Sequence, residues 1–452
     1  MNPYLRTSEK VLSPPTTPKG IIRRLGPGFI LSASIVGSGE LIATTIFGAK
    51  VGFLCLWVIL FSCLVKVAVQ LEFGRYTIAS GKTSMQILDD LPGPKFGKAG
   101  WAVWSWFIIQ MLKTLQVGGV IGGVALALNA LYPLAPIYWA VIAAIAAMAI
   151  IFRGIYAPIE KWSIIMIALF TIFTVASLIA VQWTPFAIDL PQVISGFSLT
   201  IPEGALLLAI GAFAITGVGG DEILAYNYWL IEKGYAGFTG PEPTDKEDDR
   251  EAWLARARGW IKVMQIDALL SMACYTLMTA LFYLLGAAIL HGQSLIPEGN
   301  QLIETLGRMY TDTLGPRART AFLLGAFVVL FSTLLASLAA WSRLFSDAFG
   351  RFGWIDFENE RDRKKSIAFL SVAFPIIWTL LYFWIEKPGF MVIIGGSLTT
   401  LILLLVVFAT FMMRYHWLTR ELRPGLGFDL ILWLSSLSII GAGVFVGIKF
   451  AL

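Results

Sequence analysis

The chain has 452 residues, of which 57% are hydrophobic and 14% charged, and its mean hydropathy is +0.75. A composition this apolar excludes an ordinary soluble domain and indicates a polytopic membrane protein. The net charge of +5 comes from Lys and Arg beside apolar stretches, so a membrane explains it better than a nucleic acid does. The three cysteines lie inside apolar stretches, where we expect small buried residues and no disulfide framework.

Windows of about 20 apolar residues predict about eleven membrane-spanning helices in an all-α protein. They lie at roughly 28–50, 53–74, 101–131, 137–152, 160–183, 203–231, 263–290, 318–347, 366–385, 390–413 and 428–450. Most Lys and Arg residues between the spans fall on the same side as the N-terminal tail, residues 1–27. This asymmetry predicts a cytoplasmic N-terminus in a protein of the plasma (inner) membrane.

Small and charged residues interrupt the first span near its middle. The segment Ile35–Leu41 contains Gly37, Ser38, Gly39 and Glu40 within an otherwise apolar run. Glycine weakens a helix, and a carboxylate at this depth is costly unless it faces protein or water. We therefore expect an unwound hinge here, and we expect it to line a cavity.

A matching interruption lies in the sixth span, at 218–222. Spans one to five form one half and spans six to ten the other. Each half has an odd number of spans, so two similar halves would enter the membrane from opposite sides. This pattern predicts a five-plus-five inverted repeat of the LeuT/APC type, with discontinuous helices 1 and 6 and an accessory eleventh helix. The corresponding segments are the first repeat 28–183, the external loop 184–202, the second repeat 203–413 and the accessory helix 414–452.

Unwinding at the two interruptions would free backbone carbonyls for a ligand. These carbonyls belong to Gly37, Ser38, Ile215, Thr216 and Gly217. The N-terminus of a half-helix attracts anions, but Glu40, Asp221 and Glu222 reverse the local charge. Carbonyl and carboxylate oxygens are ligands of hard cations, so we expect a site for magnesium, calcium or manganese.

Each acid also has a structural interpretation. Asp221 would be an N-cap, and Glu40 a partner of the helix dipole. Adjacent helical residues point about 100° apart, so one of Asp221 and Glu222 is expected to face away from the site. Methionine, cysteine and histidine are absent from both interruptions, which favours a partly hydrated ion such as Mg²⁺ over metals that recruit sulfur or imidazole.

Other polar residues within the spans are candidates for cavity or gate positions. They are Lys113 in the third span, Asp267 in the seventh, and Ser397 and Thr400 in the tenth. We interpret Lys66 and Glu72, with Arg75 below them, as an ion-pair set at the end of the second span rather than as part of the site.

The segment Gly37–Thr44, followed by Gly48 and Gly52, is similar to the first helix of the natural resistance-associated macrophage protein (Nramp) metal transporters, which carries an Asp-Pro-Gly-Asn hinge. The segment 209–218 is placed like the sixth helix of that family, which ends in Met-Pro-His. When the two segments are compared with the family's helices, Glu40 replaces the asparagine and Val218 replaces the methionine ligand. Gly37 stands where the metal-binding aspartate would be.

The third span lacks the acids of the family's proton pathway and has apolar residues such as Val117 instead. The chain thus resembles the Nramp-related magnesium transporters, a branch without the thioether ligand. The resemblance implies transport of Mg²⁺ and Mn²⁺ by alternating access, without proton coupling and with the metal as substrate rather than cofactor. Val218 would then line the metal site together with Glu40 and Asp221.

Apart from the lipid bilayer and the transported ion, no nucleic acid and no obligate protein partner is expected. The sequence contains no nucleophile–base set or phosphate loop of an enzyme. An amino-acid permease of the same fold is the main alternative, because Gly-Ser-Gly also occurs at such hinges. A membrane receptor that binds without transporting is a second alternative, which a flux assay separates from a carrier.

Overall fold

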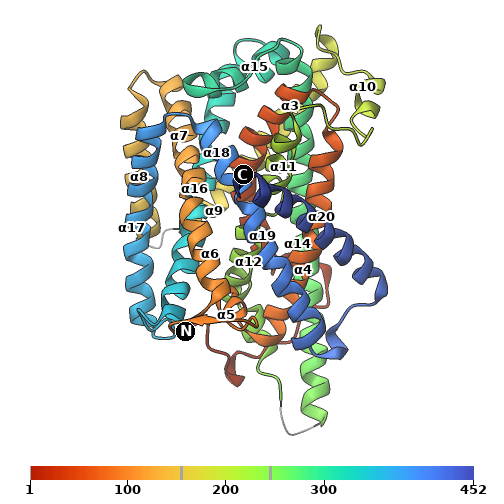
Figure 1. Ribbon diagram of the computed structural model, residues 1–452, viewed down its shortest axis with the longest axis vertical. Helices are drawn as coiled ribbons and strands as arrows, with labels where there is room; N and C mark the ends of the chain where they lie inside the picture. The colour runs from red at the N-terminus through yellow and green to blue at the C-terminus, as the bar shows by residue number, and fades with distance from the viewer. Residues whose placement is uncertain (1, 153–155, 244–246, 452) are drawn as a thin grey trace.

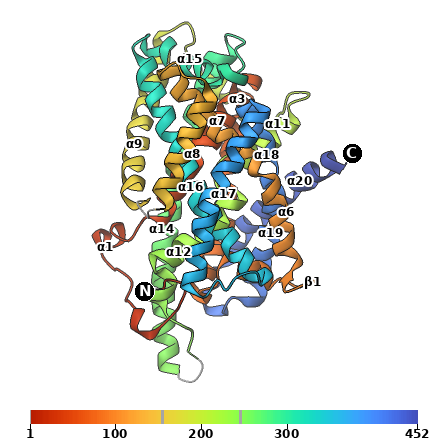
Figure 2. The same ribbon diagram turned by 90° about the vertical axis from the view of Figure 1, so that its left-hand side faces the viewer.

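The computed structural model describes residues 2–152, 156–243 and 247–451 as a bundle of helices with one two-stranded hairpin. The long helices follow one axis, with the N-terminus near one end and α15 (Leu302–Leu314) at the other (Figure 1). The N-terminal segment packs on the first turns of α14 (Glu247–Leu285), where the Trp260 indole donates to the Leu12 carbonyl at 2.9 Å (Figure 2). We call this end the N-terminal side.

Within the described residues, nine helical stretches are long and apolar enough to cross a membrane. They are Pro27–Val51, Leu56–Ser80, Trp101–Leu131, Leu206–Lys233, Asp249–His291, Ala318–Phe352, Glu360–Ile385, Pro388–Trp417 and Leu426–Phe445. Two shorter apolar helices, Pro136–Phe152 and Ile167–Trp183, lie where the fourth and fifth spans are predicted. The chain is therefore an integral membrane protein, while eleven crossings and the inverted repeat stay predictions.

Several spans consist of more than one helix. The first half contains α2 (Pro27–Ile35), a π-helix (Val36–Thr44), α3 (Thr45–Val51), α4 (Leu56–Ser80), α6 (Trp101–Leu112), α7 (Thr114–Leu131), α8 (Pro136–Phe152) and α9 (Tyr156–Ala180). The second half contains α11 (Leu206–Ile215), α12 (Gly220–Lys233), α14, a π-helix (Gly286–His291), α16 (Ala318–Phe352), α17 (Glu360–Ile385), α18 (Pro388–Ser397), α19 (Thr399–Met412), a π-helix (Met413–Trp417) and α20 (Leu426–Ala451).

The connecting segments contain short elements. These are α1 (Pro18–Ile22), α5 (Ser84–Asp89), α10 (Leu190–Ser195), α13 (Tyr235–Thr239), α15, the strands β1 (Lys95–Phe96) and β2 (Ala99–Gly100), and short 3₁₀ turns at Ser8–Lys10, Val181–Trp183, Gly299–Gln301 and Arg420–Leu422. Both α2 and α18 carry proline in their first turn, where its missing N–H leaves no helix bond unmade.

The first span is not unwound, which corrects the prediction of a hinge at Gly37–Glu40. The chain stays helical but widens into the π-helix Val36–Thr44. Thr333 of α16 explains why it does not unwind, because its hydroxyl lies 2.9 Å from the Ser34 carbonyl and accepts from the Gly37 N–H at 3.2 Å. A side chain from a distant helix therefore satisfies backbone groups that the wide turn loosens.

The sixth span is broken as predicted. Helix α11 ends at Ile215, and α12 begins at Gly220. Between them Gly217 has a φ of +65°, a left-handed conformation that favours glycine. A Cβ at this position would lie 3.0 Å from the Cα of Cys63 on α4, so the bend also needs the missing side chain.

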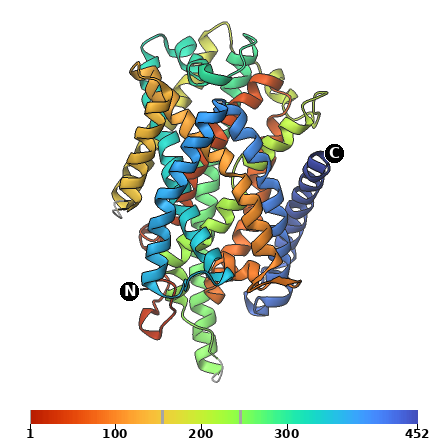
Figure 3. The same cartoon turned by 60° about the vertical axis from the view of Figure 1, so that its left-hand side comes forward.

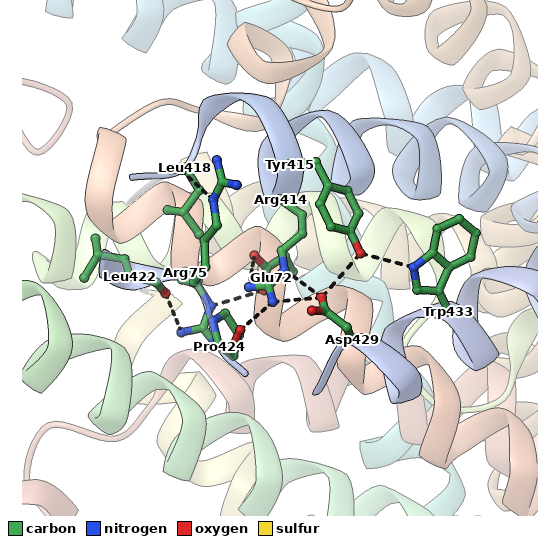
Figure 4. A network of polar contacts seen from close by, with 10 residues as sticks. Glu72, Arg75, Arg414, Tyr415, Leu418, Leu422, Pro424, Asp429 and Trp433 are labelled. Atoms are coloured by element: carbon green, nitrogen blue, oxygen red, sulfur yellow. Dashed lines mark hydrogen bonds and ion pairs between the residues drawn. The ribbon is translucent and has the colours of Figure 1, made fainter. Parts of the chain in front are cut away.

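A buried network of charges attaches α20 to the bundle, at whose edge it lies (Figure 3). The guanidinium of Arg414 lies 2.8 Å from the carboxylate of Asp429 on α20 and 3.7 Å from that of Glu72 on α4. Arg75 contacts Glu72 at 3.1 Å (Figure 4). This confirms the predicted ion pair of Glu72 and Arg75 and shows that it extends to the last helix.

We expect Arg414→Met to loosen α20. The change leaves Asp429 without its guanidinium partner, and charged hydrogen bonds of this kind contribute about 2 kcal/mol. The variant should melt at a lower temperature and be cut faster by protease between α19 and α20. Arg250→Met, which removes an exposed pair with Glu421, is the matched control and should have little effect. Equal melting of both variants would contradict an anchoring role.

Candidate metal site

Two cavities approach the break in the sixth span from opposite ends. One, on the N-terminal side, is a narrow cavity between α2, α12 and α16, lined by Asp221 and Glu222 among others. The other is larger and ends at Leu208 of α11 and Ile393 of α18. The residues between them are buried: Gly39, Glu40, Thr216, Gly217 and Val218. The chain thus closes the path between the two cavities.

Glu40 joins the first span to the break in the sixth. Its side chain is 0% exposed, and its Oε1 accepts from the Gly217 N–H at 3.0 Å and from the Thr279 hydroxyl at 2.6 Å. Its Oε2 has no hydrogen-bond partner among the residues that the structure describes. One carboxylate oxygen therefore positions Glu40, and the other is left for a ligand.

The other first-span residues of the predicted site lie differently. The N–H of Gly37 donates to Thr333, and a Cβ at Gly37 would lie 2.9 Å from the Val329 carbonyl, so Gly37 faces α16. Gly39 takes the expected place instead, because a Cβ there would lie 2.9 Å from the carbonyl of Ile215. The side chain of Ser38 is outside the described part of the chain. Gly39, which is not among the predicted site residues, is the residue that lets the two interruptions touch.

The end of α11 is closed by an ammonium group. Lys66 of α4 donates to the carbonyls of Thr216 at 2.5 Å, Phe213 at 2.8 Å and Ala214 at 3.3 Å. The Thr216 carbonyl, a predicted ligand, thus has a protein partner. Placing Lys66 with Glu72 was wrong, because residues six positions apart point to different faces of a helix.

Both acids of the sixth span line the N-terminal-side cavity. That one of them faces away from the metal site stays a prediction. The Oδ2 of Asp221 pairs with the ammonium of Lys113 and accepts from Gln110 at 3.2 Å. Its Oδ1 has no partner within the described ranges. Glu222 folds back over the start of α12, where its Oε2 would lie 2.5 Å from a Cβ on Gly219. The N-cap of α12 is Gly219, not Asp221.

The remaining candidates are all buried. Lys113 stands between α6 and α7, buried beside Asp221. Ser397 faces α11, 3.0 Å from where a Cβ of Gly211 would lie, and Thr400 is buried with no partner for its hydroxyl in the described residues. Val218 is fully buried in the core.

Asp267 caps the start of the first span. Its carboxylate accepts from the N–H groups of Gly26 at 2.8 Å and Gly28 at 2.5 Å, and from the Tyr226 hydroxyl at 3.2 Å. One side chain of α14 therefore connects α2 and α12. Its role as a gate stays a prediction.

An ion pair lies beside the N-terminal-side cavity. Arg343 of α16 contacts Glu232 of α12 at 2.6 Å, and its guanidinium lies 4.8 Å from the ring centre of Trp229, which lines the cavity. This pair connects the two walls of the cavity and is partly exposed.

The arrangement suits an ion that keeps part of its water. Among the described residues, no group of three or more His, Cys, Asp or Glu side chains is placed to hold a metal. A cation at the break would therefore combine Glu40 with carbonyl oxygens and water, which is the coordination that Mg²⁺ tolerates well.

Comparisons with known proteins show the family and the fold of the chain. A sequence profile of natural resistance-associated macrophage protein-like proteins matches residues 28–449. An uncharacterized membrane protein of Haemophilus influenzae is 29% identical over 217 residues, which are 47% of this chain and 51% of that protein. The divalent metal cation transporter MntH of Bacillus subtilis is 25% identical over 163 residues, or 34% of this chain and 37% of that protein. The matches thus span about half or less of these two relatives.

Crystal structures of a manganese transporter from Eremococcus coleocola share the fold, with a TM-score of 0.69 at 13% identity over 98% of this chain and 90% of theirs. Family and fold are those of transporters and not of enzymes. The profile covers nearly the whole chain, from the first predicted span to the last. The chain therefore belongs to the natural resistance-associated macrophage protein-like (Nramp) family.

Proposed function

We propose that this protein carries a divalent metal cation, Mg²⁺ and also Mn²⁺, across the membrane by alternating access, with its N-terminus in the cytoplasm. The observation that supports this most is Glu40, a buried carboxylate with one unpartnered oxygen among the described residues, which lies on the first span between the cavity-lining residues Ser34 and Ile46. A buried charge needs compensation, and a bound cation supplies it. The family and the relative named a divalent metal cation transporter support the same substrate class.

Glu40 is the proposed charged ligand, and the Ile215 carbonyl, which lies against Gly39, is the proposed backbone ligand. Asp221 and Glu222 line the N-terminal-side cavity and form a second position on the path. Gly37 contributes through the shape of the π-helix rather than as a contact. In alternating access, the buried layer between the cavities opens toward one cavity at a time, so that the ion never has a continuous channel.

The experiment is uptake into proteoliposomes containing the purified chain. We expect uptake of Mn²⁺ and Mg²⁺ above that of protein-free vesicles, saturable with ion concentration. Binding of Mn²⁺ without any uptake would indicate a receptor instead of a carrier. Absence of both binding and uptake would refute the proposal.

A second candidate is an amino-acid permease of the same fold. The observation in its favour is that two buried ammonium groups, Lys66 and Lys113, lie close to the acids, so the region offers both signs of charge to a zwitterion. Uptake of a panel of radiolabelled amino acids into the same vesicles separates the two functions. Amino-acid uptake without metal uptake would favour the permease.

Metal influx should not acidify the vesicle lumen. The third span carries Val117 and other apolar residues where the family has proton-pathway acids, so this route for a proton is missing. A pH-sensitive dye trapped inside the vesicles should keep a constant signal while Mn²⁺ enters. Acidification in fixed proportion to the metal would contradict this prediction.

Replacing Val218 by methionine should shift preference toward softer metals. A thioether at this buried position supplies a sulfur ligand, which soft cations favour and Mg²⁺ does not. We expect Cd²⁺ to compete more strongly for Mn²⁺ uptake in Val218→Met than in wild type, with Val218→Leu as the control of similar size. Unchanged competition would mean that Val218 does not face the ion.

A further inference from the structure

We propose that Lys66 is a resident cation of the transport site, whose ammonium occupies carbonyl oxygens at the end of α11 and must leave them when a metal ion binds there. The inference rests on the proposed function and deepens it. It adds to the site a positive charge that belongs to the protein and that competes with the substrate.

The contacts of Lys66 are those of a bound cation. Its ammonium is fully buried and lies within hydrogen-bond distance of the carbonyls of Phe213, Ala214 and Thr216. The last carbonyls of a helix have no partner in the helix itself and carry its negative partial charge. An ammonium with three donors therefore fills this end of the broken helix in the way that a small hard cation would.

Lys66 differs from an ordinary buried lysine in one respect. It has no ion-pair partner within 4.0 Å in the described part of the chain, although Glu40 and Glu222 interact with it electrostatically over longer distances. Lys113, by contrast, pairs directly with Asp221. The ammonium of Lys66 is thus held by neutral groups, namely three backbone carbonyls and the ring of Phe213, whose centre lies 5.4 Å away, and another cation is able to take its place on the carbonyls.

A divalent ion and the ammonium cannot share these oxygens. The carbonyl of Thr216 follows that of Ile215, which contacts Gly39, and Gly217 donates to Glu40, so a metal at Glu40 lies next to the carbonyls that Lys66 occupies. The metal ion and the ammonium would both be positive and adjacent, and such charges repel strongly where water is excluded. The lysine side chain is long and flexible, and Glu222 is the acid toward which the displaced ammonium is drawn.

Neutral and charged substitutions of Lys66 separate competition from packing. Glutamine donates to a carbonyl without a charge, arginine keeps the charge, and Lys82→Gln removes one positive charge from an exposed pair with Asp90. We expect purified Lys66→Gln to bind Mn²⁺ about tenfold more tightly than wild type at fixed pH and salt, because the competing charge is gone. Lys66→Arg should not bind more tightly, and Lys82→Gln should match wild type.

Equilibrium dialysis with Mn²⁺ on monodisperse protein decides between the outcomes. If wild type binds Mn²⁺ and Lys66→Gln binds it equally or less tightly, the resident-cation inference is overturned while the proposed function stands. If no preparation binds Mn²⁺ or Mg²⁺, the proposed function fails and this inference with it. Should Lys66→Gln not fold, a structure of wild type with Mn²⁺ serves instead. A metal beside Glu40 with all three lysine–carbonyl contacts intact would overturn the inference.

Discussion

Glu40→Gln is expected to lower Mn²⁺ uptake by at least about thirtyfold without unfolding the protein, because loss of one buried charged partner costs about 2–5 kcal/mol of binding. Glutamine keeps the size of the side chain and an oxygen that accepts from Gly217 and Thr279. What it removes is the charge on the second oxygen, which has no other partner among the described residues. Uptake rates in proteoliposomes, with melting temperatures measured in parallel, test the expectation.

The control for Glu40 is an acid of the same type outside the site. Glu360→Gln removes an exposed charge that pairs with Lys364 on the surface of α17, and it should leave uptake and melting unchanged. Uptake by Glu40→Gln within a few-fold of wild type would show that this carboxylate does not hold the ion. A melting temperature far below that of wild type would indicate instead that Glu40 serves to hold the π-helix against the break.

Lys113→Met is expected to destabilise the protein by about 3–5 kcal/mol, because it leaves the carboxylate of Asp221 buried without its ion-pair partner. The double variant Lys113→Met/Asp221→Asn should recover most of this loss, since neither residue is then charged. A double-mutant cycle on apparent unfolding in detergent measures the coupling. Lys82→Met, which opens an exposed pair, should change stability by less than about 1 kcal/mol.

The same double variant also tests the role of Asp221 in transport. If Asp221 is only the partner of Lys113, the double variant should transport Mn²⁺ at the wild-type rate. If its second oxygen takes part in the path, uptake should stay low although stability returns. A single variant Lys113→Met that is as stable as wild type would contradict the importance of this buried pair.

The spans and the sixth-helix break were predictable because they depend on local sequence. Long apolar windows locate the helices, and the glycines beside Asp221 predict a backbone conformation that a regular helix cannot adopt. The first span shows the same local signal, yet it forms a π-helix. The difference comes from Thr333, about 300 residues away in sequence, whose hydroxyl satisfies the loosened backbone. No local pattern contains that contact.

The charged residues also differ in how far local sequence predicts their contacts. Lys113 and Asp221 were each recognised as unusual, but their pairing joins two spans and needs the tertiary arrangement. The position of Lys66 was predictable from the helix repeat. Ser62 lies one turn before it on the same face of α4, and both side chains donate to the Phe213 carbonyl. Glu72, in contrast, lies on another face of α4.

The cap that Asp267 forms has a mechanical consequence. Since one carboxylate ties the start of α2 to α14 and to Tyr226 of α12, these three helices are expected to move as one unit. Helix α16 forms the opposite wall of the cavity and is joined to α12 by the partly exposed Arg343–Glu232 ion pair and by the Tyr228 hydroxyl, which donates to Asp347 at 2.6 Å. Rupture of these contacts would let the cavity widen toward the N-terminal side, while the clamp at Asp267 stays shut.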